Sequence, residues 1–231
     1  MPTARPPENA TTLDALGRAA ASCTGCDLYK RATQTVFGEG NPRASLMLLG
    51  EQPGHEEDLA GRPFVGPAGR LLDNALVQAG LDRRQVYVTN IVKHFKWKTK
   101  EGGKRRIHEK PGRNEVEACR PWFDKEFWLV QPEVLVCLGA TAAAVFGPAV
   151  RVGTARGREL SSPQGVRAFV TVHPSAILRI PKDEERAAEM RRFVADLRRA
   201  ARAARRPARA PREGKSPAAP RRALGRAPSR D

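Results

Sequence analysis

The chain has 231 residues, 40% of them hydrophobic, so it can bury a core and is not composed like a disordered protein. No stretch is long and apolar enough to cross a bilayer, and residues 1–21 lack the apolar centre of a signal peptide, so we expect a cytoplasmic protein. The formal net charge of +16 favours a polyanionic partner, most commonly a nucleic acid.

Composition divides the chain into an N-terminal segment (residues 1–22), a folded domain (23–199) and a tail (200–231). The tail has ten Lys or Arg residues against two acids and is otherwise mostly Ala and Pro, so it is expected to be a disordered basic tail. A solubilising role and a non-specific DNA tether both remain open for it. The domain carries the other half of the net charge and is basic in its own right.

Short apolar runs alternate with helical patterns along the domain. In chain order, the expected elements are a strand at 45–49, a helix at 68–79, a strand at 86–88, a helix at 114–130, a strand at 134–138, a helix at 140–146, a strand at 168–172 and a helix at 184–199. This alternation predicts an α/β fold of three layers, αβα, around a central, mostly parallel four-stranded sheet. Ligand sites in such sheets lie beyond the carboxyl ends of the strands.

The segment Lys93–Arg113 does not fit this layering. It is polar, contains glycine and shows no periodicity, and a loop of this length inside a domain is usually functional or disordered. Lys93 and the run Lys104, Arg105 and Arg106 are candidate phosphate contacts. His108 follows them directly. The residues alone leave His108 as either a solvated member of this basic loop or a catalytic group.

Polar or aromatic side chains follow three of the predicted strands. Glu51, Gln52, Asp58 and Phe64 come after the first strand, Asn90 after the second and His173 after the fourth. An asparagine amide suits the hydrogen-bonding edge of a nucleobase, and a phenylalanine ring suits its face. Each residue alone also has an ordinary structural role, but their convergence at one edge of the sheet predicts a site.

The four cysteines are Cys23 and Cys26, spaced as C-x2-C, and the separate Cys119 and Cys137. Disulfides are not expected in a reducing compartment, which leaves metal ligation, redox chemistry or burial. Four sulfurs match a tetrahedral zinc or a [4Fe–4S] cluster. Within the apolar run VLVCLG, Cys137 also suits a purely hydrophobic role.

Several of these motifs together resemble the uracil-DNA glycosylase superfamily. They are GEQPG followed by GRPFVGPAG, then VYVTNIVK, the four cysteines and VHPSAIL, in that order between Cys23 and Leu197. The family 4 enzymes, which carry a [4Fe–4S] cluster, are the nearest branch. The resemblance implies their fold, a DNA substrate and the cluster on Cys23, Cys26, Cys119 and Cys137.

Two features depart from family 4. Gln52 stands where that family usually has alanine, and the segment Lys104–His108, KRRIH, is absent from ordinary members. Both resemble the UdgX-type uracil-DNA-binding proteins, whose loop histidine becomes covalently joined to DNA after uracil is cleaved.

By this resemblance, Phe64 stacks on uracil, Asn90 reads its edge, and Asp58 belongs to the same binding set. His173 stabilises charge on the leaving base. His108 captures C1′ of the sugar, with Glu51 orienting it and accepting its proton, and Gln52 completing the catalytic set.

The resemblance leads us to expect a monomer near the bacterial nucleoid that cleaves uracil from DNA, preferably single-stranded, and stays covalently attached in a single turnover. Two alternatives stay open. One is a conventional multiple-turnover glycosylase, and the other is a non-catalytic, metal-stabilised DNA-binding module.

Overall fold

The computed structural model describes residues 5–99, 106–147 and 150–205. Within them, a six-stranded sheet has the order β1 (Glu39–Gly40), β3 (Tyr87–Asn90), β2 (Leu46–Gly50), β6 (Val134–Leu138), β8 (Arg167–Thr171) and β7 (Leu160–Ser161). The four middle strands are parallel and correspond to the four predicted ones. The edge strands β1 and β7 are antiparallel to their neighbours, so the sheet is mixed and wider than predicted.

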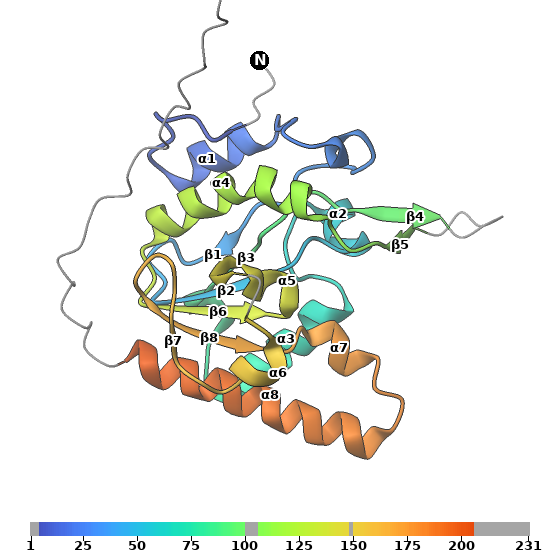
Figure 1. Cartoon of the computed structure of the whole chain (residues 1–231), viewed down its shortest axis with the longest axis vertical. Helices are drawn as coiled ribbons and strands as arrows, with labels where there is room; N and C mark the ends of the chain where they lie inside the picture. The colour runs from blue at the N-terminus through green and yellow to red at the C-terminus, as the bar shows by residue number, and fades with distance from the viewer. Residues whose placement is uncertain (1–4, 100–105, 148–149, 206–231) are drawn as a thin grey trace, which may run out of the picture.

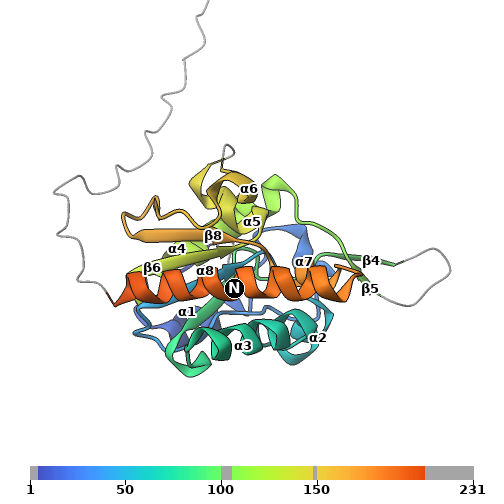
Figure 2. The ribbon, with the colours of Figure 1, turned by 90° about the horizontal axis from the view of Figure 1, so that it is seen from below.

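Helices cover both faces of this sheet (Figure 1). Leu46 and Leu48 of β2 pack with α3 (Pro67–Ala79) and α8 (Asp183–Ala204), whereas Met47 and Leu49 pack with α1 (Leu13–Ala20) and α4 (Arg113–Val130). Successive side chains of a strand point to opposite faces, so a strand buried on both sides reads as a continuous apolar run. Figure 2 shows α3 and α8 side by side on one face. The predicted three-layer arrangement is confirmed.

Two of the larger helices extend the folded part beyond its predicted limits. In α1, Leu16 and Ala20 are buried in the same cluster as α4 residues, although this segment precedes the predicted domain. In α8, Ala200 and Ala203 are buried against the sheet, so the helix continues past residue 199. Residues 206–231, most of the predicted basic tail, lie outside the described residues.

The remaining helices are short. They are η1 (Asp27–Lys30), α2 (His55–Ala60), η2 (Arg83–Gln85), α5 (Ala140–Ala143), η3 (Ala144–Phe146), α6 (Val152–Ala155) and α7 (Pro174–Leu178). The predicted helix at 140–146 is thus split into α5 and η3. Among the helices that the structure describes, none has the length and apolarity needed to cross a membrane.

The segment Lys93–Arg113 is not wholly irregular. It contains β4 (Trp97–Thr99) and β5 (Arg106–His108), which pair antiparallel and bring Trp97 opposite His108. We call these two strands the β4–β5 hairpin. Three-residue strands are too short to show the alternation that reveals a strand in a sequence.

Candidate active site

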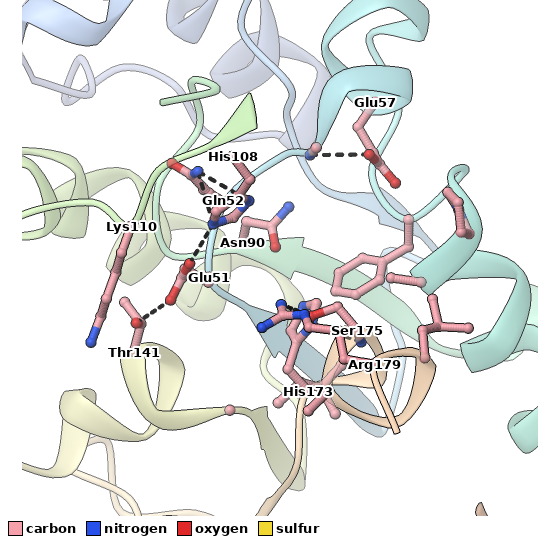
Figure 3. A pocket seen from close by; sticks show the side chains of 18 of the residues that line it. Glu51, Gln52, Glu57, Asn90, His108, Lys110, Thr141, His173, Ser175 and Arg179 are labelled. Atoms are coloured by element: carbon pink, nitrogen blue, oxygen red, sulfur yellow. Dashed lines mark hydrogen bonds and ion pairs between the residues drawn. The ribbon is translucent and has the colours of Figure 1, made fainter. Parts of the chain in front are cut away.

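A cavity of about 1340 Å³ opens at the carboxyl ends of the parallel strands (Figure 3). The end of every middle strand contributes to its wall: Glu51 and Gln52 follow β2, Asn90 ends β3, Thr141 follows β6 and His173 follows β8. This is the edge of the sheet at which the sequence predicts a ligand site.

Phe64 and Asn90 form a tightly constrained corner of this cavity. A β-carbon on Gly50 would lie 2.3 Å from Oδ1 of Asn90 and 2.6 Å from Cζ of Phe64, so only glycine fits between them. Phe64 has a positive φ of 56°, a strained conformation that costs about 1–3 kcal/mol and is typical of functional sites. Oδ1 of Asn90 is buried and has no hydrogen-bond partner within the described chain. An orphaned acceptor of this kind calls for a donor from a ligand.

His173 lies across the cavity from this corner, its ring centroid 6.0 Å from that of Phe64. Burial lowers the pKa of His173 to about 4, so the ring is neutral at physiological pH. Its Nδ1 accepts a hydrogen bond from the backbone N–H of Ser175 at 3.2 Å. The proton of the neutral ring is therefore on Nε2, which is a hydrogen-bond donor.

His108 lies beside Glu51 at the mouth of the cavity. Its Nε2 is 2.9 Å from Oε1 of Glu51, and the imidazole is 46% exposed. Thr141 donates its hydroxyl hydrogen to the other carboxylate oxygen. Burial alone would raise the pKa of Glu51, but the hydrogen bonds from His108 and Thr141 outweigh it and lower the pKa. Glu51 is therefore an ionised acceptor held in a fixed orientation.

Gln52 fastens the β4–β5 hairpin to the end of β2. Its Oε1 accepts from the N–H of Lys96 at 3.1 Å, and its Nε2 donates to the carbonyls of Lys96 (3.1 Å) and Glu109 (3.0 Å). These two residues flank the hairpin on either side, and the Gln52 amide also lies 3.3 Å from Nε2 of His108. An alanine here could make none of these bonds. Gln52 and the β4–β5 hairpin thus form one structural unit, in which Gln52 holds His108 over the cavity.

A family model described as the uracil DNA glycosylase superfamily matches residues 37–198. The chain belongs to this superfamily. A type-4 uracil-DNA glycosylase of Thermotoga maritima is 36% identical over 176 residues, covering 75% of this chain and 84% of the relative. A type-4 uracil-DNA glycosylase of Archaeoglobus fulgidus is 40% identical over 132 residues, covering 57% of this chain and 62% of the relative. A type-4 uracil-DNA glycosylase of Pyrobaculum aerophilum is 35% identical over 169 residues, covering 69% of this chain and 81% of the relative. The resemblance to the superfamily and its family 4 branch is confirmed.

Asp58 does not line the cavity, which corrects its assignment to uracil binding. Its carboxylate is fully buried and accepts hydrogen bonds from the backbone and hydroxyl of Thr33 and from Nη1 of Arg106, the last at 2.6 Å. The Arg106 guanidinium is thereby tied down, and its Nε also donates to Nδ1 of His55. Asp58 therefore anchors Arg106 of β5, and Arg106 itself lines the cavity, where its predicted contact with a DNA phosphate stays a prediction.

Lys93 is not at the surface, which corrects its assignment to DNA phosphates. Its ammonium group is buried, pairs with Glu126 and donates to Thr89 and to the carbonyl of Asn90. Glu126, on α4, also accepts hydrogen bonds from Tyr87 and from Thr89. Lys93 therefore supports the backbone of Asn90 from behind the cavity. Lys104 and Arg105 lie outside the described residues.

Replacing Lys93 with methionine should destabilise the fold, because it leaves the Glu126 carboxylate buried without its cation. Breaking a buried ion pair in this way costs about 3–5 kcal/mol. Urea denaturation measures the loss. Lys30→Met, which removes the exposed pair with Asp27, is the matched control and should leave the denaturation midpoint unchanged. Equal midpoints for the two variants would contradict the assignment.

Cys119 lies in the same core cluster as Cys23, with Cys26 packed against it. Sγ of Cys119 accepts a hydrogen bond from the N–H of Lys93 at 3.2 Å. Burial raises the pKa of Cys119 to about 12, and the nearby thiols of Cys23 and Cys26 contribute in the same direction. Cys137 is fully buried in the middle of the sheet, and burial alone raises its pKa.

The thiol arrangement bears on the choice between zinc and a cluster. Within the described chain, no three His, Cys, Asp or Glu side chains stand close enough to share one metal ion. A zinc ion needs all its sulfur ligands about 2.3 Å from a single point. A four-iron cluster binds each sulfur at a different iron, so its ligands are spread more widely. Cys23, Cys26 and Cys119 are candidate ligands for such a group.

Several residues on the cavity wall were not predicted from the sequence. Thr141 is the third residue after the end of β6, so a search of the segments that follow the strands would have found it. Lys110 and Arg179 also line the cavity, Lys110 on the side of Glu51 and Arg179 beside Ser175 (Figure 3). Both are candidate phosphate contacts in place of Lys93.

Proposed function

We propose that this protein recognises uracil in DNA, cleaves its N-glycosidic bond and stays covalently joined to C1′ of the deoxyribose through His108. The contact between His108 and Glu51 carries the proposal. An ionised Glu51 accepts the Nε2–H, so the neutral ring keeps a lone pair on its other nitrogen. The names of the type-4 relatives support base cleavage, and the His108 contact supports capture of the sugar.

Recognition follows from the corner formed by Phe64 and Asn90. The uracil nucleotide must leave the base stack to enter a cavity of this depth. The ring of Phe64 then stacks on the base, and the unpaired Oδ1 of Asn90 accepts the N3–H of uracil. Cytosine has no hydrogen on N3 and would leave this oxygen unsatisfied. A site built on such a hydrogen bond rejects the wrong partner by roughly 10⁴-fold.

Bond cleavage sends the electron pair of the C1′–N1 bond to uracil. Nε2–H of His173 donates to a uracil carbonyl and stabilises the negative charge on the leaving base. The sugar becomes oxocarbenium-like, and the imidazole lone pair of His108 forms the new N–C1′ bond. The alkylated ring then gives its Nε2 proton to Glu51, which returns the ring to neutrality.

We further propose that Cys23, Cys26 and Cys119 contribute to a [4Fe–4S] cluster. When bound, it stabilises the packing of the N-terminal segment and α4, and it takes no part in bond cleavage. The cavity that lies between the strand ends contains none of these three cysteines.

Mixing the full-length protein with uracil-containing oligonucleotides tests the proposed function. We expect a protein–DNA band that survives boiling in detergent. Single-stranded DNA should react faster than double-stranded DNA, and the protein should be a monomer. Free abasic product with many turnovers would instead establish a conventional glycosylase, the activity for which the relatives are named. If neither the covalent complex nor abasic DNA forms, the protein is a non-catalytic DNA-binding module.

Gln52→Ala should slow covalent capture more than base release, because it removes the hydrogen bonds that hold the β4–β5 hairpin at the end of β2. Displacing a reacting group by about 1 Å can cost roughly 100-fold in rate. We expect a loss of this order in the rate of complex formation, measured by quenching with detergent. Gln34→Ala, which removes hydrogen bonds to α2 away from the cavity, is the control. Wild-type capture kinetics in Gln52→Ala would contradict the role of Gln52 in positioning the β4–β5 hairpin.

The rate of uracil release should be independent of pH from about 7 down to about 5. The pKa of His173 is lowered from 6.5 to about 4 and that of Glu51 is also lowered, so the ring stays neutral and the carboxylate ionised over this range. Release should change as the pH drops through about 4, where Nδ1 of His173 gains a proton and loses the hydrogen bond from the Ser175 N–H that orients the ring. His108→Ser is used for the profile, so that covalent capture does not interfere with the measurement of release. A decline centred on the ordinary imidazole pKa would contradict a buried, neutral His173.

A further inference from the structure

The cluster needs a fourth ligand besides Cys23, Cys26 and Cys119, and the remaining cysteine is poorly placed to supply it. Cys137 is paired in register with Leu49, and Leu49 is paired with Thr89 on the far side. Neighbouring strands are about 4.8 Å apart, so Cys137 lies about 10 Å from β3. Cys119 makes its contact beyond the end of β3, at Lys93.

His94 is the residue next to that contact, and it is buried. Together with Cys23 and Thr35, it lines a second cavity of about 500 Å³, separate from the one at the strand ends. His94 therefore links the region of Cys119, through the Lys93 backbone, to that of Cys23. None of the steps proposed for uracil uses this residue.

The hydrogen bonds of His94 place the ring proton on one nitrogen and leave the other with a lone pair that can bind a metal. Nε2 lies 2.9 Å from Oγ1 of Thr35, and the Thr35 hydroxyl donates to the carbonyl of Ala20 at 2.9 Å. Since the hydroxyl hydrogen is used at Ala20, Oγ1 accepts from His94, and the ring proton is on Nε2. Nδ1 is left with a lone pair and no hydrogen-bond partner within the described residues. Histidine ligands of metals commonly donate their other ring nitrogen to a neighbouring oxygen in this way.

We propose that His94, through Nδ1, and not Cys137, is the fourth ligand of the iron–sulfur cluster. The proposal rests on the cluster assigned under the proposed function and is independent of the uracil chemistry. A neutral imidazole in place of a thiolate makes the cluster less negative, which raises its reduction potential. Cys137 is then a hydrophobic residue of the sheet.

Pulsed electron paramagnetic resonance of the anaerobically purified full-length protein, reduced with dithionite, tests the ligand directly. With ¹⁵N-labelled histidine, we expect a strong nitrogen coupling characteristic of a coordinated imidazole. The coupling should be lost in His94→Cys, with the iron content retained and the reduction potential lowered. A reduced cluster with no histidine nitrogen coupling in the wild type would overturn the proposal.

Iron content and visible absorbance of three variants provide a test that does not depend on reduction. Cys137→Ala should keep the wild-type iron content, whereas His94→Ala should lose iron, as should Cys119→Ser. Loss of iron from Cys137→Ala with retention in His94→Ala would overturn the proposal, as would zinc in place of iron. Because these readouts need no DNA, a protein with the predicted cluster but no action on uracil would refute only the proposed function.

Discussion

His108→Ser should abolish the detergent-resistant protein–DNA complex while leaving the protein folded. Serine is too short to contact Glu51 from this position, and its hydroxyl has no base beside it to activate it. The imidazole is 46% exposed, so its loss should change the stability of the fold little. Water can then enter the vacated space and capture the sugar, so that abasic DNA is released. Denaturing gels of uracil-containing oligonucleotides, with alkali treatment to reveal abasic sites, measure both products.

His55 supplies a matched control for this variant. It lines the same cavity and is also a histidine, but its Nδ1 accepts from Arg106 and it makes no contact with Glu51. His55→Ser should therefore keep the covalent complex. A complex that persists in His108→Ser, or that disappears equally in both variants, would refute His108 as the capturing residue.

His173→Ala should lower the rate of uracil release by about 10²–10³-fold, the usual cost of removing one preorganised donor from a developing negative charge. Binding of uracil-DNA should change much less, because Phe64 and Asn90 remain in place. Single-turnover measurements with excess protein separate the rate from affinity.

Ser175→Ala is the control for this second variant. It keeps the backbone N–H that holds Nδ1 of His173 and loses the hydroxyl contacts with that nitrogen at 2.8 Å and with Nη2 of Arg179 at 2.9 Å. We expect a smaller loss of rate than in His173→Ala. An unchanged rate in His173→Ala would show that the leaving base is stabilised by another group.

The core of the fold was predictable because its strands are buried on both faces. Val134–Leu138 was predicted with the bounds that the structure gives, since a continuous apolar run can be recognised without periodicity. The edge strands, such as Glu39–Gly40, contain too few residues to show a pattern. The end of α8 was missed because its last buried residues are alanines within an arginine-rich segment, which resembles a solvated tail.

The cavity was predictable from the ends of the strands, which placed Glu51, Asn90 and His173 at one edge. The role of Lys93 was not, because a lysine beside a basic loop looks exposed. Its partner Glu126 lies 33 residues further along the chain and meets it only after α4 packs on the sheet. Asp58 was misassigned for the same reason, since Arg106 reaches it from a distant hairpin.

Peptide mapping by mass spectrometry tests the covalent step most directly. Wild-type protein is incubated with a uracil-containing oligonucleotide and then digested with nuclease and protease. We predict that the peptide containing His108 carries a deoxyribose remnant, that fragment ions place it on the imidazole, and that a single uracil is released per chain. An unmodified His108 peptide, together with many uracils released per chain, would contradict covalent capture.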